Sequence, residues 1–342
     1  MKAIRFHQHG ASDVLKFEDA PDPKPGTGEV LVEIKAAGVN HLDIWVRNGL
    51  PSVKIPLPHI PGSDGAGVVA ACGPGVKKLK EGDRVALSPG MGCGECERCK
   101  SGWDSLCDKY HLLGFQVDGT YAQKIVVPER RALKVSAKLS FEEWAAVPLV
   151  FLTAWHMLIT HAHMKKGDRV LVHAAGSGIG HAAIQIAKLH GAQVFTTVGS
   201  ADKADKAKKL GADHVINYRE KDFAEEVKRL TDQKGVDIVF EHIGPETWAK
   251  SLSVLAKHGT LVTCGATSGP KVEIDLRFLY MRQQKIIGSY MGGHQELEEV
   301  ISLVEKGKLK PIVDKTFPLK DAKAAHDHMD SRRFFGKIIL SI

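Results

Sequence analysis

The sequence predicts an α/β fold in which a mostly-β domain is followed by a doubly wound, parallel-sheet domain. The chain has 342 residues, and a typical size of about 150 residues per domain predicts two domains. Residues 1–140 carry short runs of alternating apolar residues, whereas strand and helix patterns alternate five times from Arg169 onward. Such alternation is typical of a parallel sheet covered by helices.

The mostly-β pattern is clearest in the segment EVLVEIKAAGV at residues 29–39. Val30, Val32 and Ile34 have the period-2 spacing that would place them on one face of a strand. Glycines and prolines between such runs predict irregular loops. We therefore expect the first domain to span residues 1–149, with a cysteine-rich lobe at about 90–110.

The doubly wound domain is predicted at residues 150–292. Its first unit is the strand RVLVH at 169–173, which leads through several glycines into the helical pattern GHAAIQIAKLHG at 180–191. The strand KIIGSYM at 285–291 would lie at the edge of the sheet. A further helix near 296–305 and the final strand GKIILSI do not extend the alternation. Residues 293–342 are therefore expected to return to the first domain.

Composition and charge exclude several classes of protein. Hydrophobic residues make up 43% and charged residues 25% of the chain, as in ordinary folded proteins. The net charge of +7 is spread over interspersed acidic and basic residues, as in ADKADKAKK at 201–209, which argues against a nucleic-acid partner. No apolar run reaches the roughly 18–20 residues of a membrane span, and the first ten residues lack a secretory pattern. A cytoplasmic protein without a membrane partner is expected.

Four of the six cysteines lie within fifteen residues, as Cys93-x-x-Cys96-x-x-Cys99-x7-Cys107. Four thiolates at such spacing can surround one ion tetrahedrally, and they leave no open position for water or substrate. The pattern predicts one structural Zn²⁺. An iron–sulfur cluster is the alternative, although the x7 gap and the lack of a following proline differ from the ferredoxin pattern.

The turn after the strand at 169–173 predicts a nucleotide site. Backbone N–H groups in a glycine-rich turn can approach a pyrophosphate, and the helix dipole adds a favourable field. The spelling departs from G-x-G-x-x-G, because Ala175 and Ser177 occupy the first two glycine positions. The candidate residues of this turn are Gly176, Ser177, Gly178, Ile179 and Gly180.

The end of the second strand of this domain bears on the choice of cofactor. A site for NAD would place an acidic residue there to bind the ribose 2′-hydroxyl. The strand instead ends Thr197-Val198-Gly199-Ser200, and Lys203 follows one turn into the next helix. NADP(H) is therefore favoured over NAD(H).

In their order along the chain, these motifs resemble the medium-chain dehydrogenase/reductase superfamily, which includes zinc alcohol dehydrogenases and quinone oxidoreductases. The resemblance rests on AAGVNHLD (36–43), PGSDGAGVV (61–69), the cysteine lobe, AAGSGIGHAAIQIAKLHGA (174–192) and GKIIL (336–340). It implies a GroES-like catalytic domain, a Rossmann domain and an active-site cleft between them.

The resemblance also implies site residues. The zinc alcohol dehydrogenases hold a catalytic zinc at positions that correspond here to Asn40, Ser63 and Leu149, so the catalytic metal is expected to be absent. Asn40 instead matches the quinone oxidoreductase branch. In that branch, the residues expected around the 2′-phosphate of NADPH are Gly199, Ser200, Lys203, Tyr218 and Arg332, and those expected near the nicotinamide include Thr153 and Gly265.

The predicted activity is hydride transfer from NAD(P)H to a quinone, an enone or another carbonyl compound. Asn40 would bind the developing oxygen anion. The proton would come from water, His41 or His59. Asp43 and Asp64 would also lie at the site. One alternative is an alcohol dehydrogenase that interconverts alcohol and aldehyde, with atypical zinc ligands. Another is a catalytically weak NADPH-binding or RNA-associated protein. Pairing of the edge strand at 285–291 predicts a homodimer or homotetramer.

Overall fold

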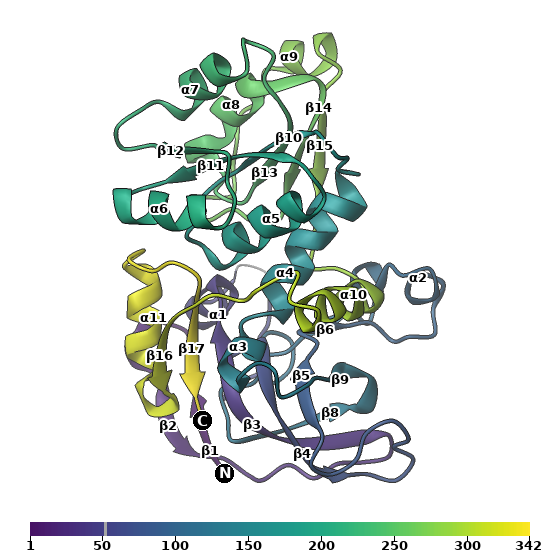
Figure 1. The fold of residues 1–342 in the computed structure, drawn as a ribbon. Helices are drawn as coiled ribbons and strands as arrows, with labels where there is room; N and C mark the ends of the chain where they lie inside the picture. The colour runs from purple at the N-terminus through teal and green to yellow at the C-terminus, as the bar shows by residue number, and fades with distance from the viewer. Residues whose placement is uncertain (51–52) are drawn as a thin grey trace. The chain divides into compact units, whose positions relative to one another are not determined.

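The computed structural model describes residues 1–50 and 53–342. Contacts within the chain divide it into two units (Figure 1). Unit 1 comprises Met1–Val150 and Gly293–Ile342, and unit 2 comprises Phe151–Gly292. Unit 1 is mostly β and unit 2 is a helix-covered parallel sheet, which confirms the predicted α/β fold class. Among the described residues, no helix combines the length and apolar character needed to cross a bilayer.

The main sheet of unit 1 is built around the long strand β3 (Glu29–Val39). Its strand order is β16-β17-β3-β4-β5-β9, and β8 also pairs with β3. Val30, Val32 and Ile34 are buried on one face of β3, as their spacing predicted. The partner strands are β4 (Asp64–Cys72), β5 (Arg84–Leu87), β8 (Lys124–Pro128), β9 (Ala132–Lys134), β16 (Val313–Pro318) and β17 (Lys337–Ser341).

The C-terminal segment contributes two of these strands. Strand β17 pairs antiparallel with β3, with Ile338 opposite Val39. The preceding helices are α10 (His294–Glu305) and α11 (Ala322–Asp330). Strand β16 was not predicted, because it is an edge strand whose residues are half-buried or exposed and therefore lack a clear apolar alternation.

Smaller elements of unit 1 surround the main sheet. Two short hairpin-like sheets pair β1 with β2 and β6 with β7. Helix α1 begins two residues after the end of β3, and α2 carries Cys99 of the lobe. The bounds are β1 (Lys2–Arg5), β2 (Lys16–Asp19), α1 (His41–Asn48), β6 (Gly90–Met91), α2 (Glu97–Lys100), β7 (His111–Leu112) and α3 (Phe141–Ala145); the 3-10 turns are η1 (Ser12–Val14), η2 (Asp104–Leu106), η3 (Glu129–Arg131) and η5 (Leu319–Asp321).

Unit 2 contains a six-stranded sheet in which every pairing is parallel. The order β12-β11-β10-β13-β14-β15 is that of a Rossmann fold, with a topological switch point between β10 and β13. The strands are β10 (Arg169–Val172), β11 (Gln193–Val198), β12 (His214–Asn217), β13 (Val236–Glu241), β14 (Leu255–Thr263) and β15 (Lys285–Gly288). The helices are α5 (Gly178–Leu189), α6 (Ala201–Lys209), α7 (Phe223–Leu230), α8 (Pro245–Val254) and α9 (Leu276–Met281).

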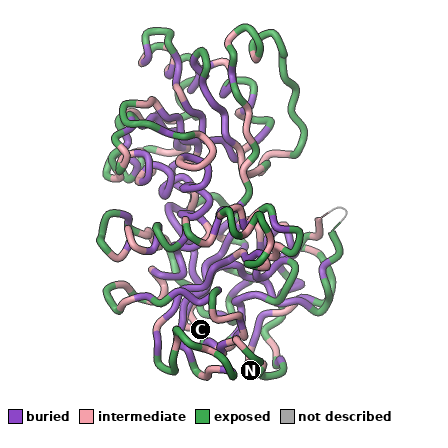
Figure 2. The backbone as a smooth tube through the Cα atoms, turned by 90° about the vertical axis from the view of Figure 1, so that its right-hand side faces the viewer, coloured by how far each residue is buried: buried purple, intermediate pink, exposed green. Residues whose placement is uncertain are grey.

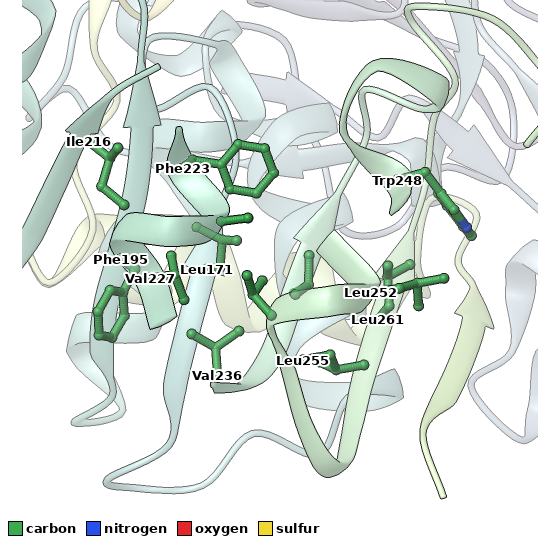
Figure 3. Close-up of a cluster of buried hydrophobic side chains, with 13 residues drawn as sticks. Leu171, Phe195, Ile216, Phe223, Val227, Val236, Trp248, Leu252, Leu255 and Leu261 are labelled. Carbon is green, nitrogen blue, oxygen red and sulfur yellow. The ribbon is translucent and has the colours of Figure 1, made fainter. Parts of the chain in front are cut away.

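Helix α4 (Pro148–Trp155) passes from unit 1 into unit 2 and continues as the π-helical segment His156–His161. Within each unit, the strands are largely buried and the connecting loops are exposed (Figure 2). In unit 2, apolar side chains of β10, β11, β13 and β14 pack against α7 and α8 (Figure 3). Leu171 and Phe195 come from the strands, and Val227 and Leu252 come from the helices. Burial of this apolar surface holds the sheet that carries the nucleotide turn.

Candidate functional site

The four cysteines of unit 1 form a cluster that we call the metal lobe. The sulfur atoms of Cys93, Cys96, Cys99 and Cys107 all lie within 4.8 Å of one another, and among the described residues no other group of His, Cys, Asp and Glu is arranged to hold a metal. Zinc–sulfur bonds of about 2.3 Å in a tetrahedron require sulfur–sulfur distances of about 3.8 Å. The sulfurs of Cys93 and Cys99 are 4.0 Å apart, so the donor set fits one zinc ion.

Backbone groups of the metal lobe stabilise thiolate ligands. The amides of Glu95 and Cys96 donate hydrogen bonds to the Cys93 sulfur at 3.4 and 3.3 Å. These bonds lower the pKa of the Cys93 thiol to about 6. A Cβ atom on Gly92 would lie 2.6 Å from the Cys99 sulfur, so the backbone can approach the cluster only because that residue is glycine.

The metal lobe docks on the N-terminus of α10. The Asp104 carboxylate accepts the backbone N–H of His294 at 3.1 Å. A Cβ atom on Gly293 would lie 2.4 Å from the carbonyl oxygen of Gly102, so the two segments pack closely. The lobe therefore supports the point at which the chain re-enters unit 1, which is a structural role for its metal.

A second cluster lies where three neighbouring strands of unit 1 begin or end, and we call Asn40, Asp64 and Lys337 the polar centre. Asn40 follows the end of β3, Asp64 begins β4 and Lys337 begins β17. Because β3 runs antiparallel to β4 and β17, the end of β3 lies beside the first residues of these two strands. The three side chains are at most 5% exposed.

Hydrogen bonds within the polar centre are short and mutually consistent. The Lys337 ammonium donates to the Asn40 side-chain oxygen at 2.6 Å, to the Asp64 carboxylate at 3.0 Å and to the Val39 carbonyl at 3.0 Å. The Asn40 amide nitrogen donates to Asp64 at 2.9 Å. The second Asp64 oxygen accepts the backbone N–H of Leu149 at 2.8 Å.

These contacts do not suit a catalytic zinc at the positions of Asn40, Ser63 and Leu149. The Asn40 side-chain oxygen is bound by an ammonium. The Ser63 hydroxyl donates to the Leu113 carbonyl at 2.8 Å, and leucine offers no side-chain donor. Since a catalytic zinc site needs three protein ligands, the residues present at these positions do not fit the metal.

Asp43 lies beside the polar centre, in the first turn of α1. Its carboxylate accepts the backbone N–H of Asn40 at 2.8 Å and the Tyr121 hydroxyl at 3.0 Å. The other carboxylate oxygen is buried and has no hydrogen-bond partner among the described residues. Complete burial raises the pKa of Asp43 to about 7, although Lys337 opposes the shift. Asp43 can therefore hold a proton near neutral pH.

Tyr121 links Asp43 to a further buried group that the sequence analysis missed. Its hydroxyl lies 3.3 Å from a ring nitrogen of His326, and the other ring nitrogen lies 3.0 Å from the Arg47 guanidinium. Burial, with the Arg47 charge, lowers the pKa of His326 to about 3. His326 is therefore neutral and can accept one of these hydrogen bonds.

The two candidate proton donors differ in environment. His41 is half-buried at the start of α1, with its ring centroid 6.3 Å from that of Trp45. His59 is 1% exposed, and a ring nitrogen lies 3.5 Å from the Asp118 carboxylate. Burial lowers the pKa of His59 and keeps its ring from solvent, whereas the ring of His41 is within reach of solvent.

In unit 2, the glycine turn connects β10 to α5 at the switch point of the sheet. Ser177 caps α5, and its hydroxyl accepts the Gly180 amide at 2.9 Å. A Cβ atom on Gly180 would lie 2.2 Å from the Ala174 carbonyl, so this turn requires glycine there. Gly178 and Ile179 at the helix N-terminus are half-buried. This geometry fits a dinucleotide pyrophosphate.

Residues expected at the 2′-phosphate lie at the ends of β11 and β12. Gly199 and Ser200 follow β11, and a Cβ atom on Gly199 would lie 2.6 Å from the Tyr218 hydroxyl. Tyr218 is half exposed, and Lys203 is half-buried in the first turn of α6. Arg332 belongs to unit 1, where it follows α11 with a left-handed φ of 56°.

The loop His242–Gly244 is bound to the loop that begins at Gly265, which is expected near the nicotinamide. Thr267 donates its hydroxyl to the His242 carbonyl at 3.0 Å, and Ser268 donates to the Ile243 carbonyl at 2.8 Å. A Cβ atom on Gly265 would lie 3.2 Å from the His242 carbonyl. Thr153 is buried in α4, with its hydroxyl 4.0 Å from the Met291 sulfur.

A buried network beneath the glycine turn was also missed. The His173 ring lies 2.9 Å from the Ser251 hydroxyl, which donates to Glu241 at 2.9 Å. The other ring nitrogen of His173 lies 3.3 Å from the Thr197 hydroxyl, which accepts a hydrogen bond from the Ala174 amide at 3.0 Å. The network connects β10, β11 and β13 below the cofactor turn.

Lys337 is the residue of the polar centre that the sequence analysis did not assign to the site. It is the second residue of GKIIL, which the sequence analysis quoted only as a motif resembling the superfamily. Its strand was predicted, but its partners lie 273 and 297 residues away. Only the pairing of β17 with β3 brings them together.

Comparisons with known proteins agree with this architecture. Residues 26–137 match the family described as "Alcohol dehydrogenase GroES-like domain", and residues 178–306 match "Zinc-binding dehydrogenase". Quinone oxidoreductase 1 of Escherichia coli strain K12 is 34% identical, over 98% of each chain. An NAD-dependent alcohol dehydrogenase of Sulfolobus acidocaldarius is 33% identical, over the whole of both chains.

A solved structure shows the same likeness in three dimensions. The crystal structure of an NAD-dependent alcohol dehydrogenase superimposes with a TM-score of 0.97 and 46% identity, over the whole of both chains. The matched families, the relatives and the cysteine cluster agree with one another. The chain therefore belongs to the medium-chain dehydrogenase/reductase superfamily, as an NAD(P)-dependent oxidoreductase with a structural zinc lobe.

Proposed function

We propose that the protein reduces a quinone or an enone with NADPH and uses no catalytic metal. The observation that carries this proposal is the polar centre, in which Lys337 and Asp64 already bind both ends of the Asn40 amide. Of the residues at the positions of a catalytic zinc, Asn40 and Ser63 are thus hydrogen-bonded within the protein, and Leu149 has no side-chain ligand atom. A simple carbonyl compound is commonly polarised by a metal before it accepts a hydride. A quinone or an enone is already electron-poor, so its reduction does not depend on such a metal.

When bound, NADPH would supply the hydride, with its electron pair, for a ring carbon of the quinone or the β-carbon of the enone, and one proton would complete the reduction. Asn40 would donate a hydrogen bond from its amide nitrogen to the oxygen on which negative charge develops. The linked loops at His242–Gly244 and Gly265–Thr267, together with Thr153, would hold the nicotinamide ring. Water or His41 would supply the proton, since the His59 ring is buried and its pKa lowered.

A preference for NADPH is supported by the end of β11, where no acidic residue follows directly. Gly199, Ser200, Lys203 and Tyr218 would bind the 2′-phosphate, and Arg332 is the further residue that the sequence predicts there. Asp202 was not weighed in the sequence analysis, and it lies in the first turn of α6, where Ser200 bonds to its carboxylate and lowers its pKa. Because Ser200 already binds this carboxylate, we propose that Asp202 does not take the place of the acidic residue of NAD sites.

A substrate screen tests the activity directly. Quinones, enones, aldehydes and alcohols would be supplied with NADPH, NADH or the oxidised cofactors, and the nicotinamide absorbance followed. We expect the highest kcat/KM for NADPH with a quinone or an enone, unchanged after brief treatment with a chelator. Turnover of simple alcohols alone, with dependence on added zinc, would contradict the proposal.

An alcohol dehydrogenase is the second candidate. It is favoured by the 46% identical structure, which is named an NAD-dependent alcohol dehydrogenase. The two candidates differ in metal content, because an alcohol dehydrogenase with atypical ligands needs a second zinc. Metal analysis that finds two zinc ions per chain, with activity lost when the weaker one is removed, would favour this candidate.

We also propose that two copies of the chain pair through unit 2. Among the residues that the structure describes, strand β15 pairs with β14 and with no other strand, so its outer edge presents unpaired backbone groups. The preceding helix α9 exposes large apolar side chains, including Leu276 at 65%, Tyr280 at 66% and Met281 at 71%. A two-fold contact between copies would cover both features in a homodimer, and pairs of dimers would form a homotetramer.

The oligomer can be tested by changing this surface. Replacing Leu276 and Met281 with lysine should shift the protein to a smaller species in light scattering after gel filtration. Leu189→Lys is the control, because Leu189 is also partly exposed, at 39%, but lies at the end of α5. A wild-type protein that is monomeric at micromolar concentration would disprove the proposed pairing.

A further inference from the structure

We propose that Lys337 is a positioning residue for the reaction: with Asp64, it holds the Asn40 amide so that one N–H remains for the substrate oxygen. This inference rests on the proposed function, in which Asn40 binds the developing oxygen anion. Lys337 would act through Asn40 and would not itself contact the substrate. Its ammonium would also supply the positive charge of a centre that lacks a metal.

The orientation of the Asn40 amide follows from its two charged neighbours. Its oxygen accepts from the Lys337 ammonium at 2.6 Å, and its nitrogen donates to the Asp64 carboxylate at 2.9 Å. The flipped amide would set a nitrogen donor against the ammonium and an oxygen acceptor against the carboxylate. An ammonium only donates and a carboxylate only accepts, so one orientation is enforced.

The Asn40 nitrogen carries two hydrogens, and only one is firmly used. Its second contact, with the Gly38 carbonyl, is 3.5 Å long, at the outer limit of a hydrogen bond. This second N–H is the donor that can turn to a substrate oxygen at little cost. Pre-oriented donors of this kind stabilise developing charge because they need no reorganisation during the reaction.

Local backbone geometry is built to bring the polar centre together. Gly336, just before Lys337, has a φ of +111°, and a Cβ atom there would lie 2.4 Å from the Ile312 carbonyl. On β3, a Cβ atom on Gly38 would lie 2.5 Å from the Ala145 carbonyl and 3.2 Å from the Asp64 carboxylate. Both positions therefore require glycine for Lys337 and Asp64 to approach Asn40.

Charge also favours this role. Lys337 is 2% exposed, and its ammonium donates to three oxygens, one of them on a carboxylate. A buried charge is poorly screened by water and so acts more strongly on a nearby group than an exposed charge does. Because Lys337 withdraws electron density from the Asn40 oxygen, it strengthens the Asn40 N–H as a donor.

The kinetic test compares Lys337→Met and Lys337→Arg with the control Lys124→Met, which removes a partly exposed lysine paired with Asp22. With a quinone or enone, Lys337→Met should lower kcat about 100-fold, as loss of a pre-oriented donor does. KM and NADPH affinity should stay within about twofold, Lys337→Arg should recover part of kcat, and Lys124→Met should match the wild type. A folded Lys337→Met protein with wild-type kcat would overturn the proposal.

Lys337→Met leaves Asp64 buried without its counter-ion and can fail to fold. The double variant Asp64→Asn/Lys337→Met removes both charges, so no buried charge is left unpaired. We expect it to fold and bind NADPH like the wild type, yet to retain the low kcat. Wild-type kcat in the folded double variant would overturn the role of Lys337.

A spectroscopic readout separates this inference from the proposed function. In ¹⁵N-asparagine-labelled protein, the Asn40 side-chain amide, identified by its loss in Asn40→Asp, should show two distinct, slowly exchanging protons. In the double variant, these protons should exchange at least about tenfold faster, since their fixed partners are gone. If no quinone or enone is turned over, the proposed function fails, but unchanged Asn40 amide signals alone would refute the positioning role.

Discussion

The metal lobe and the polar centre both collect chemically active side chains in unit 1, but they use different cations. The lobe draws its four cysteines from residues 93–107 and fits an external zinc ion. The polar centre draws Asn40, Asp64 and Lys337 from three strands and uses the ammonium of Lys337. A bound metal ion can stabilise a short loop that has no hydrophobic core of its own. The buried ammonium of Lys337, by contrast, is held in place by strands that are already folded.

Burial makes the two sites respond differently to change. Cys93, Cys96 and Cys99 are half-buried, so solvent, chelators and oxidants can reach the lobe. Asp64 and Lys337 are almost fully buried, so removing one of them leaves the other charge without water or partner. We therefore expect chelation to act at the lobe and substitution of Lys337 to act at the polar centre.

The largest expected effect separates the lobe from the rest of unit 1. Cys96→Ser removes a zinc ligand and should lower the unfolding free energy by about 4 kcal/mol or more, or Tm by about 10 °C. Calorimetry and metal analysis check this: the wild type should hold about one zinc per chain, and the variant much less. Cys72→Ser, outside the lobe, is the control and should keep its zinc.

Activity measurements complete this test. The folded fraction of Cys96→Ser should retain its kcat, because the lobe is not part of the proposed reaction. If zinc content and Tm were both unchanged, the four sulfurs would not be a metal site.

Lys337→Met should have the next largest effect on stability. Removing one partner of a buried ion pair lowers the unfolding free energy by about 3 to 5 kcal/mol. Denaturant unfolding should show this loss, and Asp64→Asn/Lys337→Met should recover most of it. Lys124→Met breaks an exposed pair with Asp22 and should change stability by less than about 1 kcal/mol. Equal losses in the two lysine variants would show that burial does not distinguish the pairs.

Lys203 extends the comparison to a cation that is expected to bind a ligand. Lys203→Ala should weaken NADPH binding by about 1.5 to 3 kcal/mol, the contribution of a hydrogen bond to a charged group, and should spare NADH. Titration of cofactor fluorescence measures both affinities. Lys206→Ala, on the same helix, is the control. Equal or stronger binding of NADH by the wild type would disprove the NADPH preference.

The smallest effect, counted per pH unit, is the pH dependence introduced by Asp43. Burial raises its pKa from 3.8 in the unfolded chain to about 7 in the fold. The folded state therefore holds a proton that the unfolded state releases, and this contribution to stability is full below about pH 4 and is lost as pH rises to about 7. Relative to Asp43→Asn, the wild type should lose up to about 1.4 kcal/mol per pH unit in this window.

This slope must be measured as a difference between the two proteins. Buried histidines with lowered pKa values, such as His173 at about 4 and His326 at about 3, give slopes of the opposite sign. Denaturant unfolding at pH 4.5, 5.5, 6.5 and 7.5 would report it, since the amide that replaces the carboxyl group in Asp43→Asn cannot titrate. Parallel stability curves for the two proteins would show that Asp43 is ionised throughout.

Local patterns in the sequence determined much of this protein. The cysteine spacing predicts a metal site because all four ligands belong to one loop, and the turn from 174 to 180 predicts a nucleotide site because strand, glycines and helix are contiguous. The alternation of strands and helices likewise predicts the parallel sheet, because each element is recognised from the spacing of apolar residues that are close together in the chain. The sequence also indicated the family, through motifs that are each continuous in the chain.

Only the tertiary structure decided the partners of buried polar groups. Lys337 meets Asn40 across 297 residues and Tyr121 meets His326 across 205, and neither pairing leaves a local pattern. Asp43 and Asp64 were both candidate residues, yet burial and the nearest cation separate them: Lys337 pairs with Asp64, while Asp43 can keep a proton near pH 7. Strand order sets these distances, and strand order depends on the packing of the whole sheet.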